Sequence, residues 1–370
     1  MSEPILQVRG LSIAYPIAIG TVHAVENVDL DLSDGEALGL VGESGCGKST
    51  LGLAVLRLVR PPGRITAGRI LYHGQDILAM REPEVRALRG RAITMAFQNP
   101  LTSLNPLYRI DRQFLETIRE HEPRTGRADA LARAERVLAE LGVESRRLYE
   151  YPHQLSGGMR QRVMLALGLV MNPDILVADE PTTALDVIVE AGFIDLLNRL
   201  RRDLKLSILL ITHNLGMVAE IADRIAVMYA GKIVEVGEAG QVFHRPLHPY
   251  THGLIHCVPN IRLDQGNLAT MGGSPPDLVE PPSGCRFHPR CPHVMDICRR
   301  REPPFAPPRT ASQFTGLSAP AEASADPRTG APVATSPIPA AGAAPSSGEA
   351  RTDGDLENRR VACWLYGGKP

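Results

Sequence analysis

The stretch from Gly42 to Thr50, GESGCGKST, constrains the fold more than any other part of the chain. It matches the pattern G-x-x-x-x-G-K-[ST], in which a glycine-rich loop wraps backbone N–H groups around a phosphate. The apolar run EALGLVG precedes the loop and the helical pattern LGLAVLRL follows it. We therefore expect a strand, a phosphate-binding loop and a helix N-terminus in that order. The residues expected to contact phosphate or its metal ion are Gly42, Ser44, Gly45, Cys46, Gly47, Lys48, Ser49 and Thr50.

Three further motifs carry side chains suited to phosphate chemistry. ILVADEP places Asp179 and Glu180 at the end of an apolar run, where Asp179 can orient Mg²⁺ and Glu180 can polarise a water molecule as general base. LSGGMRQ opens a helix with a Ser-Gly-Gly turn and predicts a second phosphate cradle. His213 follows the run LSILLIT and is placed to contact a γ-phosphate. With Lys48 as the phosphate-binding cation and Ser49 as a metal ligand, these residues predict nucleotide hydrolysis.

The apolar runs predict an α/β fold. DILVAD and LSILLIT are apolar on successive residues, as expected of strands that are covered on both faces in a parallel sheet. RIAVMYAGKIVEVG predicts two strands around Ala230 and Gly231. Residues 100–165 have helical patterns, including ADALARAERVLAEL stopped by Gly142. We expect a P-loop NTPase core with a mixed sheet over residues 1–245, interrupted by a helical subdomain over about 100–165.

The remainder of the chain differs in amino-acid composition. Residues 246–310 are rich in Pro, His and Cys, and they are expected to form a small C-terminal extension. From 311 to 350, 31 of 40 residues are Ala, Pro, Ser, Gly or Thr. Such a segment buries too little apolar surface to offset its ordering entropy, so residues 311–358 are predicted to be a disordered insertion. Residues 359–370 form a terminal segment.

Composition excludes several classes of protein. The net charge of −1 gives no general attraction to nucleic acid, so no nucleic-acid partner is expected. No apolar run approaches the roughly 18 residues that a membrane-spanning helix needs. The first residues, MSEPILQVRG, lack the basic start and apolar core of a secretory signal. The chain is therefore expected in the cytosol, where six cysteines favour metal or redox chemistry over disulfides.

Together these motifs resemble the nucleotide-binding subunit of an ABC transporter. The matching elements are the Walker A loop from Gly42 to Thr50, the Q-loop residue Gln98, the signature residues Ser156, Gly157 and Gly158, the Walker B pair Asp179 and Glu180, the D-loop ending at Asp186, and the switch residue His213. The resemblance implies catalytic roles for Lys48, Gln98, Glu180 and His213, and Mg²⁺ ligation by Ser49, Gln98 and Asp179. Tyr15 lies where the family stacks an aromatic ring on adenine, although packing on the core is an open alternative.

The resemblance also implies partners. Members of this family pair head to tail, so ATP bound at Lys48 would be completed by the signature motif of a second nucleotide-binding subunit, and Ser156 to Gly158 would act in trans. The implied assembly contains a paralogous ATPase subunit, two membrane-spanning permease subunits and an extracytoplasmic substrate-binding protein. The chain is then expected to lie peripherally on the cytoplasmic face of the bacterial inner membrane.

Longer segments are similar to the dipeptide/oligopeptide permease branch. These segments are FQNPLTSLNPL, YPHQLSGGMRQRVMLALGL, HPYTHGLIHCVP and GSPPDLVEPPSGCRFHPRC, and the long loop RPPGRITAGRILYHGQDIL favours the first of the two ATPase subunits of that branch. The implied function is an ATPase that powers peptide import. Import of nickel or a sugar, and a soluble ABC ATPase without permeases, are the alternatives.

Four cysteines near the C-terminus do not lie in an apolar pattern of the kind that buried core residues form. They stand among Arg, His and Pro: Cys285, Cys291, Cys298 and Cys363. Four thiolates suit either a 4Fe–4S cluster or zinc. The spacing is wide for a zinc knuckle, and Cys291-Pro292 is similar to the Cys-Pro of ferredoxin loops. Some ATPases of the permease branch carry a 4Fe–4S cluster on such cysteines, and the resemblance implies one here. Zinc, or no metal, remains open.

Overall fold

The computed structural model describes residues 3–98, 103–182, 186–256, 271–308 and 359–366 of the 370-residue chain. The chain forms two compact units. Unit 1 contains Met1–Ile233 and Pro275–Pro281, and unit 2 contains Val234–Ser274 and Pro282–Pro370. No helix within the described ranges has both the length and the apolar character needed to cross a membrane. The segment predicted as a disordered insertion, 311–358, lies outside the described residues.

Parallel strands in the order β9-β3-β8-β7-β6 form the centre of unit 1, within a seven-stranded sheet that continues from β9 to β10 and β11. The parallel strands are β3 (Ala37–Val41), β6 (Ile93–Ala96), β7 (Ile175–Asp179), β8 (Ser207–Thr212) and β9 (Arg224–Tyr229). Every residue of β3, β7 and β8 is buried. The prediction of a parallel sheet covered on both faces is therefore confirmed. Because the carboxyl ends of parallel strands meet at one edge, the loops after β3, β7 and β8 lie together.

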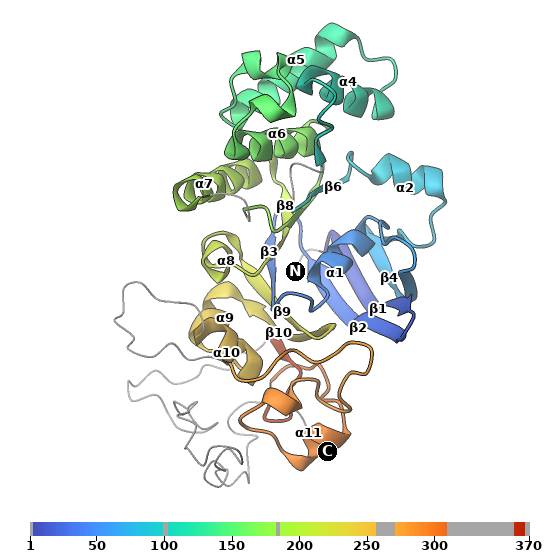
Figure 1. Ribbon diagram of the computed structural model, residues 1–370, viewed down its shortest axis with the longest axis vertical. Coiled ribbons are helices and arrows are strands. Elements are labelled where there is room, and N and C mark those ends of the chain that lie inside the picture. Colours follow the sequence, from blue (N-terminus) through green and yellow to red (C-terminus); the bar gives the residue numbers. More distant parts are fainter. Residues whose placement is uncertain (1–2, 99–102, 183–185, 257–270, 309–358, 367–370) are drawn as a thin grey trace. The chain divides into compact units, whose positions relative to one another are not determined.

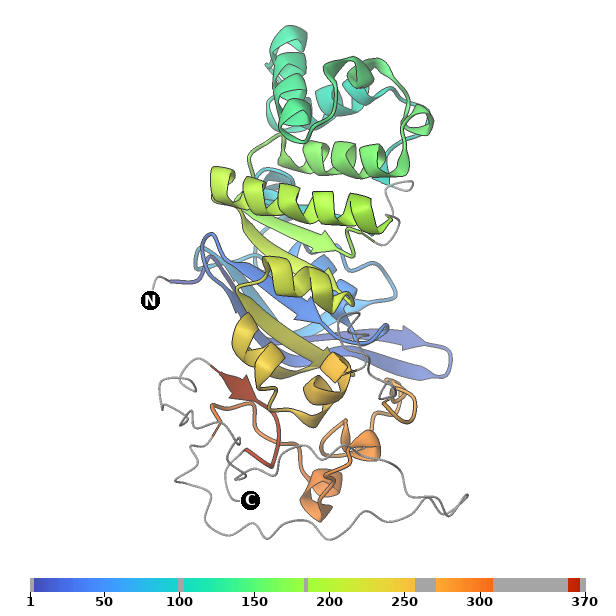
Figure 2. The ribbon, with the colours of Figure 1, turned by 90° about the vertical axis from the view of Figure 1, so that its left-hand side faces the viewer.

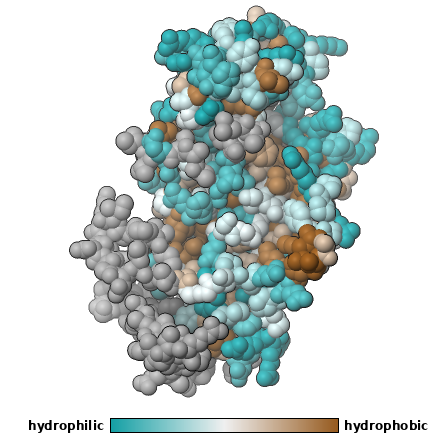
Figure 3. Space-filling view, in the orientation of Figure 1, coloured by the Kyte–Doolittle hydropathy of each residue, from teal (hydrophilic) through white to brown (hydrophobic). Residues whose placement is uncertain are grey.

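An antiparallel sheet accompanies it in the same unit, with the order β2-β1-β4-β5 (Figure 1). Its strands are β1 (Leu6–Ile17), β2 (Gly20–Leu32), β4 (Arg64–Tyr72) and β5 (Gln75–Asp76). At the tip of the β1–β2 hairpin, Ile17 and Ile19 are exposed. Figure 3 shows a mainly hydrophilic face with a few hydrophobic patches. The two sheets together make the mixed α/β core that the sequence predicted.

The helices of unit 1 fall into two groups. The sheets are accompanied by α1 (Lys48–Val55), α2 (Glu82–Leu88), α7 (Val187–Leu204) and α8 (Leu215–Ile221), while α4 (Ile110–His121), α5 (Arg127–Glu140) and α6 (Gly157–Leu169) gather at one end of the unit (Figures 1 and 2). The second group forms the predicted helical insertion. α5 ends where the sequence predicted, since the N–H of Gly142 donates to Ala139 O and that of Val143 to Leu138 O.

Unit 2 is built from short elements. They are α9 (Ala239–His244), α10 (Pro249–His256), α11 (Asp296–Arg300), β11 (Arg360–Val361) and most of β10 (Lys232–Glu238), which begins in the last residues of unit 1. β11 pairs antiparallel with β10, Glu235 opposite Val361. Val361, Cys363 and Tyr366 form a small buried cluster against Leu247 and Leu365. The terminal segment is therefore an integral part of unit 2.

Candidate functional site

The phosphate-binding loop runs from the end of β3 to the start of α1, as the sequence predicted. Gly47 precedes α1 with φ 107°, in the region that favours glycine, and a Cβ atom there would lie 2.1 Å from the carbonyl oxygen of Ala24. The close approach of the β2 backbone therefore requires glycine at this position. A glycine-rich loop that leads into a helix N-terminus is suited to bind an anion.

Lys48 lies inside this loop. Its side chain is buried, and Nζ donates to Gly42 O at 2.8 Å and to Glu43 O at 2.9 Å. Cys46 Sγ lies 3.7 Å from Nζ. Burial raises the pKa of the Cys46 thiol, and the Lys48 ammonium offsets only part of that rise. The Lys48 side chain is thus fixed among carbonyl oxygens of its own loop, and Cys46 is held as a neutral thiol.

The first Walker B carboxylate meets the loop directly. Ser49 Oγ donates to Asp179 Oδ1 at 2.9 Å, across 130 residues of sequence. Burial raises the pKa of Asp179; Ser49 and Lys48 oppose that rise, while Glu180 adds to it. A hydroxyl and a buried carboxylate at this separation are oxygen donors of the kind that Mg²⁺ prefers. A cation at this place would also favour the ionised form of Asp179.

The Glu180 carboxylate contacts side chains from two other motifs. Its Oε2 accepts from Gln98 Nε2 at 2.7 Å, and its Oε1 lies 3.0 Å from His213 Nδ1. Glu180 has φ 45°, and its N–H donates to Ile211 O at 2.7 Å, so β8 helps to fix the turn. Sequence analysis assigned these three side chains separately, and the fold brings them together around one carboxylate. His213 remains 61% exposed, which leaves its ring accessible.

The signature motif lies elsewhere in unit 1. Ser156 caps α6, where its Oγ accepts from the N–H of Met159 at 3.3 Å, and Gly157 and Gly158 form the first turn. Figure 1 shows α6 in the helical group, apart from α1, which begins at Lys48. One copy of the chain therefore does not bring its own Ser156 to its own phosphate-binding loop.

Tyr15 packs on a neighbouring loop. It pairs with Val22 across the β1–β2 hairpin, and a Cβ atom at Gly63 would lie 2.3 Å from Tyr15 Cε1. The ring therefore lies directly against the backbone of Gly63. This contact gives the tyrosine a packing role on one face, while a role in stacking on adenine stays a prediction.

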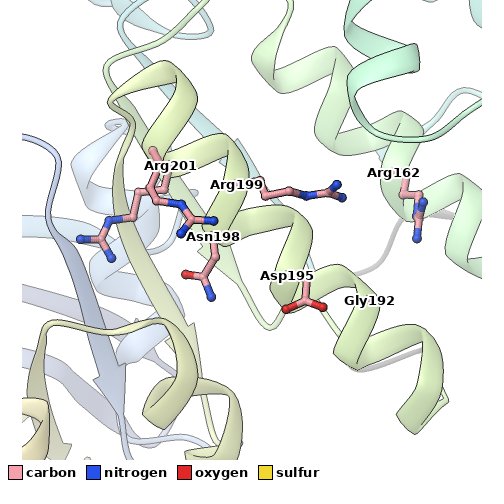
Figure 4. Close-up of a pocket in the computed structure, with 7 residues that line it drawn as sticks. Arg162, Gly192, Asp195, Asn198, Arg199 and Arg201 are labelled. Carbon is pink, nitrogen blue, oxygen red and sulfur yellow. The ribbon is translucent and has the colours of Figure 1, made fainter.

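A pocket beside α7 is separate from these residues (Figure 4). It is lined by Arg162, Gly192, Asp195, Asn198, Arg199, Arg201 and Arg202. Arg162 donates to Leu141 O at 3.0 Å, and Arg201 donates to Gly35 O at 3.0 Å. These two arginines tie their helices to neighbouring loops. None of the predicted phosphate-contacting residues lines this pocket.

The four cysteines of the tail gather in unit 2. All four carry free thiols and line one small cavity: Cys285, Cys291, Cys298 and Cys363. Cys285 N donates to Cys298 O at 2.8 Å, which closes the loop between them. Burial, together with the neighbouring thiols, raises the pKa of Cys285 to about 11 and that of Cys291 to about 12. Cys285 and Cys291 are therefore neutral thiols unless a cation holds them as thiolates.

The four thiols line one cavity but do not form a metal site in this structure. Within the described ranges, no group of three or more His, Cys, Asp or Glu side chains has the arrangement that a metal ion requires. Among the described residues, the four thiols thus line one cavity without the ligand arrangement that the predicted 4Fe–4S cluster or zinc site needs.

The loop, the carboxylate pair and the glutamine and histidine on Glu180 define a P-loop ATPase of the ATP-binding-cassette class. The family profile described as "ABC transporter" matches residues 25–183, and the one described as "Oligopeptide/dipeptide transporter, C-terminal region" matches residues 234–298. The chain belongs to the ABC transporter family, in the branch of dipeptide and oligopeptide transport ATP-binding proteins.

Individual relatives agree with this assignment. The dipeptide transport ATP-binding protein DppD of Bacillus subtilis is 44% identical over 306 residues, which cover 81% of this chain and 90% of that protein. The oligopeptide transport ATP-binding protein OppD of Salmonella typhimurium is 43% identical over 314 residues, 84% of this chain and 93% of that one. Among solved structures, the dimeric MJ0796, a bacterial ABC transporter cassette, aligns with a TM-score of 0.58 and 26% identity, over 63% of this chain and 98% of that one.

A second set of polar residues beside the carboxylate pair is not predicted by the sequence motifs. Glu190 in the first turn of α7 contacts Thr182 and Asn214. None of the three belongs to the catalytic residues assigned from the motifs. The available signal was an acidic residue in the first turn of the helix that follows Asp186, which alone indicates only a favourable helix N-terminus.

Proposed function

We propose that this chain is the ATP-hydrolysing subunit of an importer for dipeptides or oligopeptides. The observation that carries the proposal is the joint contact of Gln98 and His213 with Glu180, in a chain whose relatives are named for peptide transport. A carboxylate held by two side chains from separate loops is suited to position and polarise a water molecule. The C-terminal match at residues 234–298 supports the peptide branch.

The residues divide the work of hydrolysis. Lys48 and the backbone of its loop bind the β- and γ-phosphates of ATP, and Glu180 acts as general base on the attacking water. Gln98 and His213 orient the Glu180 carboxylate and sense the γ-phosphate. Mg²⁺, held by Ser49, Gln98 and Asp179, would neutralise charge on the transferring phosphate. Ser49 and Asp179 fit this role because their oxygens already lie 2.9 Å apart.

Completion of each ATP site requires a second subunit. Because α6 and α1 lie apart within unit 1, Ser156, Gly157 and Gly158 are free to serve the nucleotide of a partner. The partner is proposed to be a paralogous ATPase, with two membrane-spanning permease subunits and an extracytoplasmic substrate-binding protein. The chain would then lie peripherally on the cytoplasmic face of the inner membrane. The functional division into ATPase domain 1–245, extension 246–310 and terminal segment 359–370 belongs to the same proposal.

Reconstitution of the full transporter tests the function. The chain, its paralogue and the two permeases would be placed in lipid nanodiscs with the substrate-binding protein, and phosphate release would be measured with and without peptides. We expect peptides to stimulate ATP hydrolysis, with a complex containing Glu180→Gln as the inactive control. Stimulation by nickel or a sugar in place of peptides would refute the proposed cargo.

For unit 2 we propose that the four thiols hold a 4Fe–4S cluster, with zinc as the alternative. Support comes from four free thiols that line one cavity. Because burial raises the pKa values of Cys285 and Cys291, ligation would have to displace the protons of these thiols. A cluster would clamp the terminal segment to the loop at Cys285–Cys298. No step of ATP hydrolysis passes through it.

Anaerobic purification tests this assignment. Iron, acid-labile sulfide and zinc would be quantified per chain, together with visible absorbance. We expect iron and sulfide in the wild type and their loss in Cys363→Ser. Cys46→Ser, which alters a thiol of unit 1, is the matched control and should retain them. Stoichiometric zinc without sulfide would replace the cluster with zinc, and a metal-free chain would refute both.

A further inference from the structure

Glu190 joins two loops that carry residues of the hydrolytic site. Its Oε1 accepts from Asn214 Nδ2 at 2.6 Å and from Thr182 Oγ1 at 3.3 Å. Thr182 follows Glu180 by two residues, and Asn214 follows His213 directly. One carboxylate oxygen on α7 therefore connects the loop after β7 with the loop after β8.

The orientation of the Asn214 amide is fixed. Its Oδ1 accepts from the N–H of Gly216 at 3.0 Å and from that of Met217 at 3.3 Å, which caps α8. The backbone N–H of Asn214 donates to Thr212 Oγ1 at 3.0 Å. With the oxygen occupied by the helix N-terminus, the amide can present only its NH₂ group to Glu190. A substitution of Glu190 would thus remove a contact of Asn214, the residue next to His213.

The Thr182 end of the connection is equally well fixed. Thr182 is buried, and its hydroxyl also lies 3.8 Å from Met217 Sδ on α8. Just before it, the carbonyl of Pro181 accepts a hydrogen bond from Gln161 Nε2 on α6. The chain between Glu180 and Thr182 therefore has little freedom while Thr182 stays in place.

We propose that Glu190 is a positioning residue for ATP hydrolysis, which holds the loops of Glu180 and His213 in register through Thr182 and Asn214. The inference rests on the proposed ATPase function of the chain. Glu190 touches neither base nor switch histidine, so it acts on the rate of the chemical step rather than on nucleotide binding. A misplacement of reacting groups by about 1 Å is enough to cost roughly a hundredfold in rate.

The first test separates the hydrogen bonds from the mere presence of a side chain. In the reconstituted transporter, Glu190→Ala should lower kcat for ATP about tenfold and leave KM for ATP within about twofold of the wild type. Glu190→Gln keeps an oxygen acceptor of the same reach, and its kcat should stay within about threefold of the wild type. Equal losses in both variants, or a native kcat in Glu190→Ala, would overturn the proposal.

The second test exchanges donor and acceptor across the pair. Asn214→Asp places a second carboxylate against Glu190 but still caps α8, so kcat should fall at least about tenfold through like-charge repulsion. The double variant Asn214→Asp/Glu190→Gln restores one donor and one acceptor with reversed roles. Its kcat should recover to within about threefold of the wild type. A double variant no faster than Asn214→Asp would refute the connection.

Two controls keep the outcomes distinct. Thermal unfolding and equilibrium ATP binding of each variant identify a chain that has lost its fold. If Glu190→Ala fails to fold, the proposal is judged by whether the double variant Asn214→Asp/Glu190→Gln recovers the kcat lost in Asn214→Asp. A wild-type transporter that hydrolyses ATP without a response to peptides refutes the peptide proposal alone. The variants then still test the positioning role of Glu190. A wild-type transporter without hydrolysis overturns both.

Discussion

A buried ion pair holds the terminal segment in unit 2, and its removal offers a quantitative test. Glu235 is fully buried, and its carboxylate accepts from the N–H groups of Leu247 and His248 at 2.9 Å each. Arg359, also buried, is its ion-pair partner and donates to Arg245 O at 2.9 Å as well. The change Arg359→Met keeps much of the apolar stem but leaves the carboxylate without its cation.

The expected cost follows from these contacts. Breaking one side of a buried ion pair costs about 3–5 kcal/mol, and the two retained N–H donors favour the lower end, about 3 kcal/mol. Arg359 immediately precedes β11, so the loss falls on the pairing of β11 with β10. An energy of about 3 kcal/mol corresponds to a local opening roughly a hundredfold more frequent.

Amide hydrogen exchange in the metal-free chain measures this opening. The N–H of Val361 donates to Ala306 O at 2.9 Å, and that of Ala362 to Val234 O at 2.9 Å, so both report on the terminal segment. Their exchange should be roughly a hundredfold faster in Arg359→Met. The double variant Glu235→Gln/Arg359→Met removes the unpaired charge and should recover more than half of the lost protection. Unchanged exchange in the single variant would refute the reasoning.

Three further outcomes are expected. Glu180→Gln should bind ATP normally but lose at least about a hundredfold in turnover, measured as phosphate release, while size-exclusion chromatography reports a trapped dimer. Gly284→Ala should destabilise unit 2 in denaturant titrations, because φ is 69° and the new Cβ would lie 2.4 Å from Cys298 O; Gly35→Ala, with φ 67° and open space, isolates the backbone strain and should cost only about 1 kcal/mol. Asp111→Asn should weaken the helical subdomain by about 1–2 kcal/mol. Burial acts to raise the pKa of Asp111, but its arginine partners lower it overall, so this stabilisation is present above the ordinary carboxyl pKa and is lost as the pH falls below it, which acid unfolding monitored by circular dichroism can follow.

Sequence reasoning succeeded where chemistry and strand order coincide. Asp179 and Glu180 follow one buried run and His213 follows another, so a parallel sheet necessarily placed them at one edge. Glu190 could not be predicted in the same way. Its contact with Asn214 depends on how α7 is rotated against α8, which is set by side-chain packing rather than by a motif.

The cysteines show a different limit of sequence reasoning. The chemistry of Cys285, Cys291 and Cys298 predicts a shared metal site, and the hydrogen bond from the N–H of Cys285 to Cys298 O brings the two ends of this segment together. Whether the thiols point at a common centre depends on their rotamers, which the positions of the cysteines along the chain do not determine. The arrival of Cys363 also depends on Arg359 and β11, whose pairing is not encoded near the other cysteines.

The separation of Ser156 from Lys48 has a genetic consequence. In a heterodimer with a paralogue, a lesion at Lys48 and a lesion at Ser156 on the same polypeptide injure different catalytic centres, so the pair should abolish both. If the Ser156 lesion is instead combined with one in the paralogue's phosphate loop, both defects fall on a single centre and the other stays intact. Double variants assembled in one transporter should therefore differ: the pair on one polypeptide should abolish ATP hydrolysis, whereas the pair divided between the two polypeptides should retain the activity of one centre.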